Sequence, residues 1–199
     1  MVTSEAPQTT APAPTASSAT PSSETVLPSG GDDLLVFFNT YRIIVNLVTV
    51  PSLEGWQQRA AELGLVVSFQ ADRDLLSHRG PLEVVVAFEP SAPIEGASQL
   101  HARGPMKAAL SFELKSAPPF DWNAAKDIYD PPAIAVLERT PYQARLGGPR
   151  EPDLIPTLLA VALAAAGEGV VYHTGLDAWA HGTDARAMWT ELRRENEAL

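Results

Sequence analysis

Two stretches in the middle of the chain alternate between apolar and polar positions. Their apolar residues are Leu82, Val84, Val86 and Phe88 in the first, and Met106, Ala108, Leu110, Phe112 and Leu114 in the second. A period of two with one apolar face is typical of a strand that is covered on one side. The pattern predicts two strands whose Glu and Lys side chains lie on a solvated face. If the strands pair antiparallel, these charges can lie opposite each other.

Three other stretches carry apolar residues at helical spacing. The first follows Ser52, a plausible N-cap, and ends at Gly64, which suits the left-handed conformation after a helix. The second, residues 154–166, is apolar on nearly every side, which predicts a helix buried against the sheet. The third follows Thr183, predicted to be its N-cap, and places Ala185, Met188, Trp189 and Leu192 along one stripe.

The remaining strand predictions depend on short runs of β-branched and aromatic residues. They cover residues 34–50, as a hairpin or as one long strand, and residues 65–70, 133–138 and 169–173. Residues 117–132 contain four prolines and are expected to be irregular. This order of elements predicts an α+β domain with a mainly antiparallel or mixed sheet and helices packed on one face.

Residues 1–33 differ in composition from the rest of the chain. They contain 12 Ser or Thr, 5 Pro and 5 Ala, four acidic residues and no basic one. Such a segment has too little apolar surface to offset the entropy lost on ordering its backbone. We therefore expect a disordered tail over residues 1–33, followed by a single α+β domain over residues 34–199.

Composition and charge narrow the classes of function. The chain has no Cys, which excludes disulfides and thiolate zinc sites. A formal net charge of −10 argues against binding to nucleic acid or to an anionic membrane. No stretch is apolar enough to cross a bilayer and no secretory signal is recognisable, which predicts a cytoplasmic protein. A Ser/Thr/Pro-rich tail also leaves open a tethered structural component of an envelope or particle.

One local pattern suggests metal binding. His173, Asp177 and His181 follow one another at a spacing of four, which on a helix would align two imidazoles and a carboxylate for a divalent metal. A metal-dependent hydrolase is therefore one alternative. Gly175 and Gly182 bracket the stretch, however, and favour the end of a strand followed by a loop. We therefore predict no cofactor, with the divalent metal as the alternative.

Other catalytic patterns are weak, and the sequence points away from an enzyme. It contains no nucleophile-elbow motif and no glycine-rich phosphate loop. Arg79 and Arg103 each stand shortly before Gly-Pro and a predicted strand, so the two guanidinium groups are candidates for one anion-binding corner.

Aromatic residues in Gly- and Pro-rich stretches favour protein binding. Buried aromatic side chains dominate many interfaces, and acidic charge speeds association with a basic partner. We therefore expect a non-catalytic acidic protein-binding domain, of the bacterial toxin-neutralising (immunity) or effector-accessory kind, whose partner is another, basic protein. The oligomeric state is left open. The predicted binding residues are Phe120, Trp122, Tyr129, Asp177 and Trp179.

Overall fold

The computed structural model describes residues 34–35, 41–97, 100, 104–121, 131–148 and 154–197. The chain divides into two units, Met1–Gly31 and Asp32–Leu199, and every element described below belongs to the second. The predicted tail of residues 1–33 lies outside the described residues.

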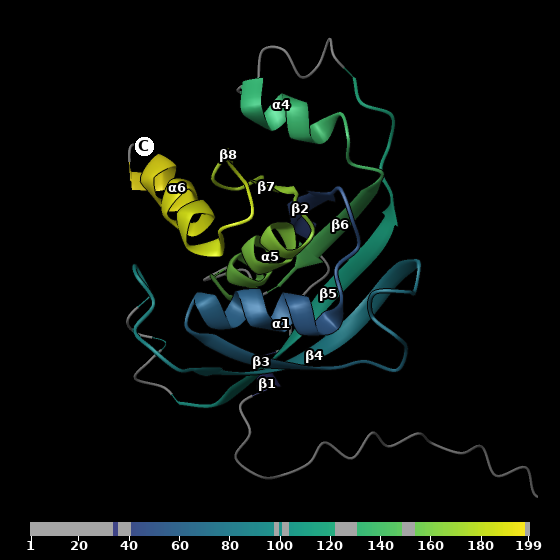
Figure 1. Cartoon of the computed structure of the whole chain (residues 1–199). Coiled ribbons are helices and arrows are strands. Elements are labelled where there is room, and N and C mark those ends of the chain that lie inside the picture. Colours follow the sequence, from purple (N-terminus) through teal and green to yellow (C-terminus); the bar gives the residue numbers. More distant parts are fainter. Residues whose placement is uncertain are drawn as a thin grey trace, which may run out of the picture. The chain divides into compact units, whose positions relative to one another are not determined.

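The described residues form eight strands and four helices (Figure 1). The strands are β1 Leu34–Leu35, β2 Tyr41–Leu47, β3 Leu65–Gln70, β4 Gly80–Pro90, β5 Met106–Ser116, β6 Tyr142–Gly147, β7 Val170–His173 and β8 Ala178–His181. The helices are α1 Leu53–Glu62, α4 Pro131–Leu137, α5 Leu154–Ala166 and α6 Ala185–Glu197.

One sheet contains all of these strands. Seven of them follow the order β3-β4-β5-β6-β2-β7-β8, and every neighbouring pair in this order is antiparallel. The short β1 pairs in parallel with β5 at Lys107 and Ala108, beyond the end of β6. The predicted α+β class with a mainly antiparallel sheet is confirmed.

The pairing also decides between the two interpretations of residues 34–50. Because β1 is parallel to β5, and β5 and β2 are both antiparallel to β6, strands β1 and β2 run in the same direction. They do not form a hairpin. The single-strand interpretation is closer, but the chain changes its pairing partner between β1 and β2, from β5 to β6 and β7.

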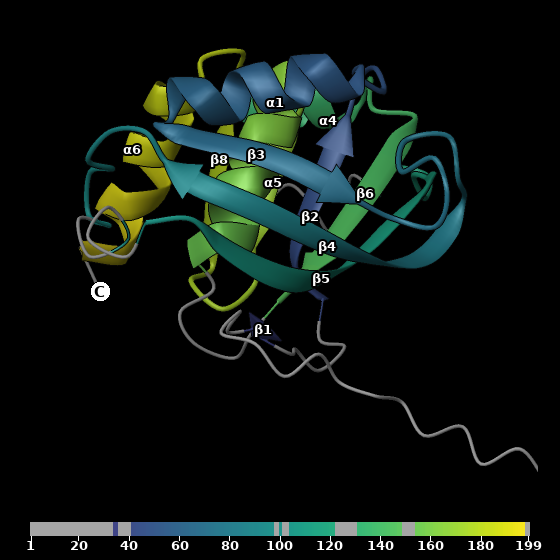
Figure 2. The same cartoon turned by 90° about the horizontal axis from the view of Figure 1, so that it is seen from below.

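Three helices cover the face of the sheet that carries the core. Helix α5 contacts β2, β6, β7 and β8, while α1 packs along β3 and α6 packs on β8 (Figure 2). Residues 155–165 of α5 are all buried, as its uniformly apolar sequence predicts. Among the described residues, no helix is long and apolar enough to cross a membrane.

The short helix α4 lies apart from the other three. It contacts β7 and β8, and in Figure 1 these strands lie between α4 and α5. Its buried side chains Ala133 and Leu137 are not part of the main core. The strand predicted over residues 133–138 is therefore wrong: the segment is helical and buries Ala133 and Leu137, one turn apart, while Ile134 and Val136 are only half-buried.

Capping explains where two helices begin and one ends. The Ser52 hydroxyl accepts a hydrogen bond from the Gly55 N–H at 3.0 Å, and Gly64 adopts φ +85° after α1, as predicted. For α6 the predicted cap, Thr183, is wrong by one residue. The Asp184 carboxylate accepts the N–H groups of Arg186 at 2.9 Å and Ala187 at 3.1 Å.

Candidate functional site

The segment predicted to be a loop after β7 is a β-hairpin. Strands β7 and β8 pair with Val170 opposite His181 and His173 opposite Ala178, and residues 174–177 form the turn between them. Asp177 ends the turn with φ +50°, a conformation that Asn and Asp tolerate better than most residues. The sequence signal for this turn was present in Gly175 and Asp177, but the four residues of β8 are too few for a periodicity to be seen.

The hairpin brings two aromatic rings together. Tyr172 and Trp179 lie directly opposite each other, with ring centroids 3.9 Å apart and planes inclined by 15°. The Tyr172 hydroxyl donates a hydrogen bond of 2.8 Å to Oδ1 of Asp177. Both rings are half-buried and Asp177 is exposed. Two predicted binding residues, Asp177 and Trp179, thus form one cluster with Tyr172, which the sequence analysis did not select.

This aromatic pair lies on the outer face of the sheet, which we define as the face opposite α1, α5 and α6; the short helix α4 contacts β7 and β8 on this same face. Val171 and Ala180, the alternate residues of the hairpin, are buried in the core, so Tyr172 and Trp179 point the other way. Across the neighbouring strands, Tyr172 is opposite Ile44 of β2, and Ile44 is opposite Arg145 of β6. Arg145 is in turn opposite Glu113 of β5.

A chain of polar contacts continues along the outer face. The Gln143 amide donates to Oδ1 of Asn46 at 3.2 Å, and Nε of Arg145 donates to Oε1 of Gln143 at 3.3 Å. Arg145 and Lys115 lie 3.9 Å and 3.7 Å from Glu113. The two ion pairs of Glu113 join partly exposed groups and therefore stabilise the fold only weakly. The predicted Glu–Lys pairs between β4 and β5 do not form, because Glu83 lies opposite Ser111 and Lys107 opposite Ala87.

The structure does not bring the three predicted metal ligands together. His173 lies on the core face of the hairpin and is 4% exposed, whereas His181 shares the outer face with Tyr172 and Trp179. Nδ1 of His173 accepts the N–H of Leu176 at 3.2 Å within the turn. The two histidines are also three residue steps apart along the strands, about 10 Å. Nowhere in the described ranges do three His, Asp or Glu side chains form a group that suits a metal ion.

Of the three other predicted binding residues, the structure describes only Phe120. Phe120 is half-buried and has a contact within the chain. Trp122 and Tyr129 lie outside the described residues. The structure therefore places Asp177 and Trp179 in one cluster and gives no arrangement for the complete predicted set.

Arg103, one of the two arginines of the suggested anion-binding corner, lies outside the described residues. Each arginine precedes a strand, and β4 and β5 are antiparallel, so the two strands begin at opposite ends of the pair. Gly80 pairs with Leu114 and Phe88 with Met106, which separates these ends by about 27 Å. Arg79 donates to the carbonyl oxygens of Leu76, Ser77 and His78 at 3.0–3.2 Å.

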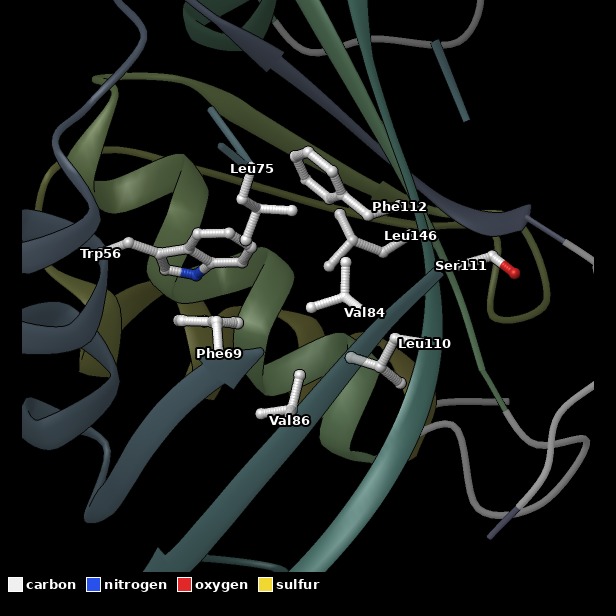
Figure 3. Close-up of a pocket in the computed structure, with 9 residues that line it drawn as sticks. All are labelled: Trp56, Phe69, Leu75, Val84, Val86, Leu110, Ser111, Phe112 and Leu146. Atoms are coloured by element: carbon white, nitrogen blue, oxygen red, sulfur yellow. The ribbon is translucent and has the colours of Figure 1, made fainter. Parts of the chain in front are cut away.

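A small cavity lies between the sheet and α1, and it is lined by Trp56, Phe69, Leu75, Val84, Val86, Leu110, Ser111, Phe112 and Leu146 (Figure 3). Its volume is about 10 Å³, room for one water molecule at most. Figure 3 shows the hydroxyl of Ser111 pointing away from the other side chains, so the lining is apolar. This space is a packing gap in the core and not a ligand site.

Comparison of the chain with protein-family models, curated proteins and solved structures finds no match.

Proposed function

We propose that this chain is a non-catalytic acidic protein-binding domain that binds a basic protein through the Tyr172–Asp177–Trp179 cluster. Within this proposal it acts in the bacterial cytoplasm, by neutralising a toxin or by accompanying an effector. The formal net charge of −10 supports a basic partner, because opposite charges accelerate encounter and suppress binding to acidic proteins.

The observation that carries the proposal is the geometry of the aromatic pair. An aromatic face beside a carboxylate suits a guanidinium or ammonium group, which gains a cation–π contact from the ring and an ion pair from the acid. Stacking on Trp179 and the hydrogen bond to Asp177 already restrict the Tyr172 side chain. Little side-chain entropy would then be lost when a partner binds, which favours affinity.

The test is affinity capture from the native host at low and moderate salt, followed by titration calorimetry with the captured protein. We expect Trp179→Ala to weaken binding by about 2 kcal/mol, the loss typical of a hot-spot aromatic residue. Asp177→Asn keeps an acceptor for the Tyr172 hydroxyl but removes the charge, so it should reduce both the affinity and its salt dependence.

A matched control distinguishes the local charge from the total charge. Asp72→Asn makes the same change at an exposed residue in the connection between β3 and β4, far from β8 in the strand order, and should leave binding nearly unchanged. Equal effects of the two Asn variants, or unaltered affinity of a folded Trp179→Ala variant, would remove the cluster from the interface. An acidic captured protein would contradict the proposed partner class.

A further inference from the structure

Strand β3 ends the sheet on the side away from the aromatic pair. It follows α1 and occupies one end of the strand order, while β8 occupies the other. Its six residues, Leu-Val-Val-Ser-Phe-Gln, contain no charge, no Pro and no Gly. Proteins usually protect such an edge with charged side chains, Pro or a bulge, because an unpaired edge pairs readily with another strand.

Three observations show which backbone groups of β3 face outward. Leu65 is opposite Pro90, which has no N–H, so this pair does not exchange hydrogen bonds in the ladder. One residue earlier, the Ser91 N–H donates to the Gly64 carbonyl at 2.8 Å. Beyond the edge, Nε2 of Gln57 donates to the Val67 carbonyl at 3.1 Å. The alternation therefore turns the N–H and C=O groups of Leu65, Val67 and Phe69 away from β4.

The side chains on the outer side of β3 are themselves uncharged and exposed, with Glu89 of β4 opposite Val66. Val66 is 52% exposed and Leu53, at the start of α1, is 40% exposed; no other large apolar side chain among the described residues is as exposed. Ser68 and Gln70 complete the outer side of the strand and are also exposed.

We propose that β3 pairs with β3 of a second copy of this chain, antiparallel and across a two-fold axis at Val67. Val67 would face its equivalent, and Leu65 would face Phe69 of the other copy, so each outward backbone group meets a partner. On the outer face Val66 would lie opposite Ser68 of the other copy. A chain with charge −10 repels its own copies, and this charge-free strand is a place where two of them can meet without opposed carboxylates.

The two-fold arrangement is favoured over a foreign strand because the edge is self-complementary. In a two-fold pair, the outward N–H and C=O groups of each β3 bond to the β3 of the other copy. Neither strand then has a free edge to which a third copy could add. A basic partner of the kind proposed above would gain no ion pair from an uncharged strand. The second copy would pair with β3, at the other end of the strand order from the β7–β8 hairpin, so this inference does not depend on the proposed function.

Gln57 competes with the second copy, because its side chain already occupies the central carbonyl of the edge. This competition gives two variants with opposite expected effects. Gln57→Ala frees the Val67 carbonyl and should tighten the dimer several-fold. Ser68→Lys should weaken it about tenfold or more, because the two lysines would lie diagonally across the two-fold axis and repel each other.

The experiment is sedimentation of the full chain from low micromolar to submillimolar concentration. Ala109→Lys, on the outer face of β5 and two strands inside the edge, is the matched control and should leave the dimer intact. Circular dichroism and thermal unfolding establish that each variant folds. A monomer at every concentration, for both the unmodified chain and Gln57→Ala, would overturn the proposal. So would a dimer that Ser68→Lys and Ala109→Lys weaken equally.

Discussion

Gly169 lies between α5 and β7, against the backbone of β2. A Cβ atom there would overlap the carbonyl oxygen of Asn46, and the Gly169 N–H donates to the Ala164 carbonyl at 2.8 Å. From the sequence, Gly169 is expected only at the start of a predicted strand, residues 169–173. The close approach to Asn46 is a contact between residues distant in sequence, which local patterns do not contain.

We expect Gly169→Ala to lower the free energy of unfolding by at least about 2 kcal/mol, because β2 and β7 would have to separate. Gly104→Ala is the control. Gly104 has φ +70°, but a Cβ atom there would meet no heavy atom within 4 Å outside the adjacent residues, so only backbone strain of about 1 kcal/mol is expected. Urea denaturation measures both values, and equal losses would contradict the close packing at Gly169.

The carboxylate of Asp74 stabilises the turn that precedes β4. Hydrogen bonds from the Ser77 hydroxyl and from the Leu76 N–H lower the pKa of Asp74 below its ordinary value. A lowered pKa means that the turn is fully stabilised above the ordinary pKa and loses this contribution as the pH falls through the lowered one. NMR titration of the Asp74 carboxyl should show the shift, and Ser77→Ala should raise the pKa toward its ordinary value. An unchanged titration in Ser77→Ala would exclude this cause.

At the scale of elements, prediction succeeded where periodicity was long. The alternation through β4 and β5 runs over many residues, and α5 is apolar throughout, so each pattern identifies its element. Strand β6 was missed because Gln143 and Arg145 lie on the polar outer face and its six residues show little contrast. Helix α4 was mistaken for a strand because its Ile and Val residues also suit a sheet, and only its contact with β7 and β8 selects the helix.

Substitutions at the N-terminus of α6 test which residue caps this helix. Asp184→Ala removes the acceptor of two backbone N–H groups and should cost about 1 kcal/mol of stability. Thr183→Ala should change stability by less than about 0.5 kcal/mol, because Thr183 is exposed and does not cap the helix. Thermal unfolding of the two variants compares them. A larger loss in Thr183→Ala would restore the cap predicted from the sequence.

At the scale of the whole molecule, the two proposed contact surfaces lie at opposite ends of the strand order. The aromatic pair belongs to the β7–β8 hairpin, and the dimer edge belongs to β3. The two surfaces share no side chain. The effects of substitutions in them on the free energies of dimerisation and of partner binding should therefore be additive.

We therefore expect Ser68→Lys to weaken the dimer without changing partner affinity, and Trp179→Ala to weaken partner binding without changing the dimer. The double variant should show both losses, with a coupling energy below about 0.5 kcal/mol. Sedimentation and calorimetry on the four proteins complete this cycle. A larger coupling energy would mean that dimerisation at β3 changes the affinity of the β7–β8 hairpin for its partner.

The sequence alone determined the class of the fold, the longest strands and helices and the acidic charge, because periodicity and composition are local properties of the chain. Only the tertiary structure decided which side chains meet. The spacing of His173, Asp177 and His181 suggested a ligand set, but pairing in a hairpin turned the two imidazoles to opposite faces. The same pairing placed Tyr172 on Trp179, a contact that depends on strand register and that no pattern along the chain specifies.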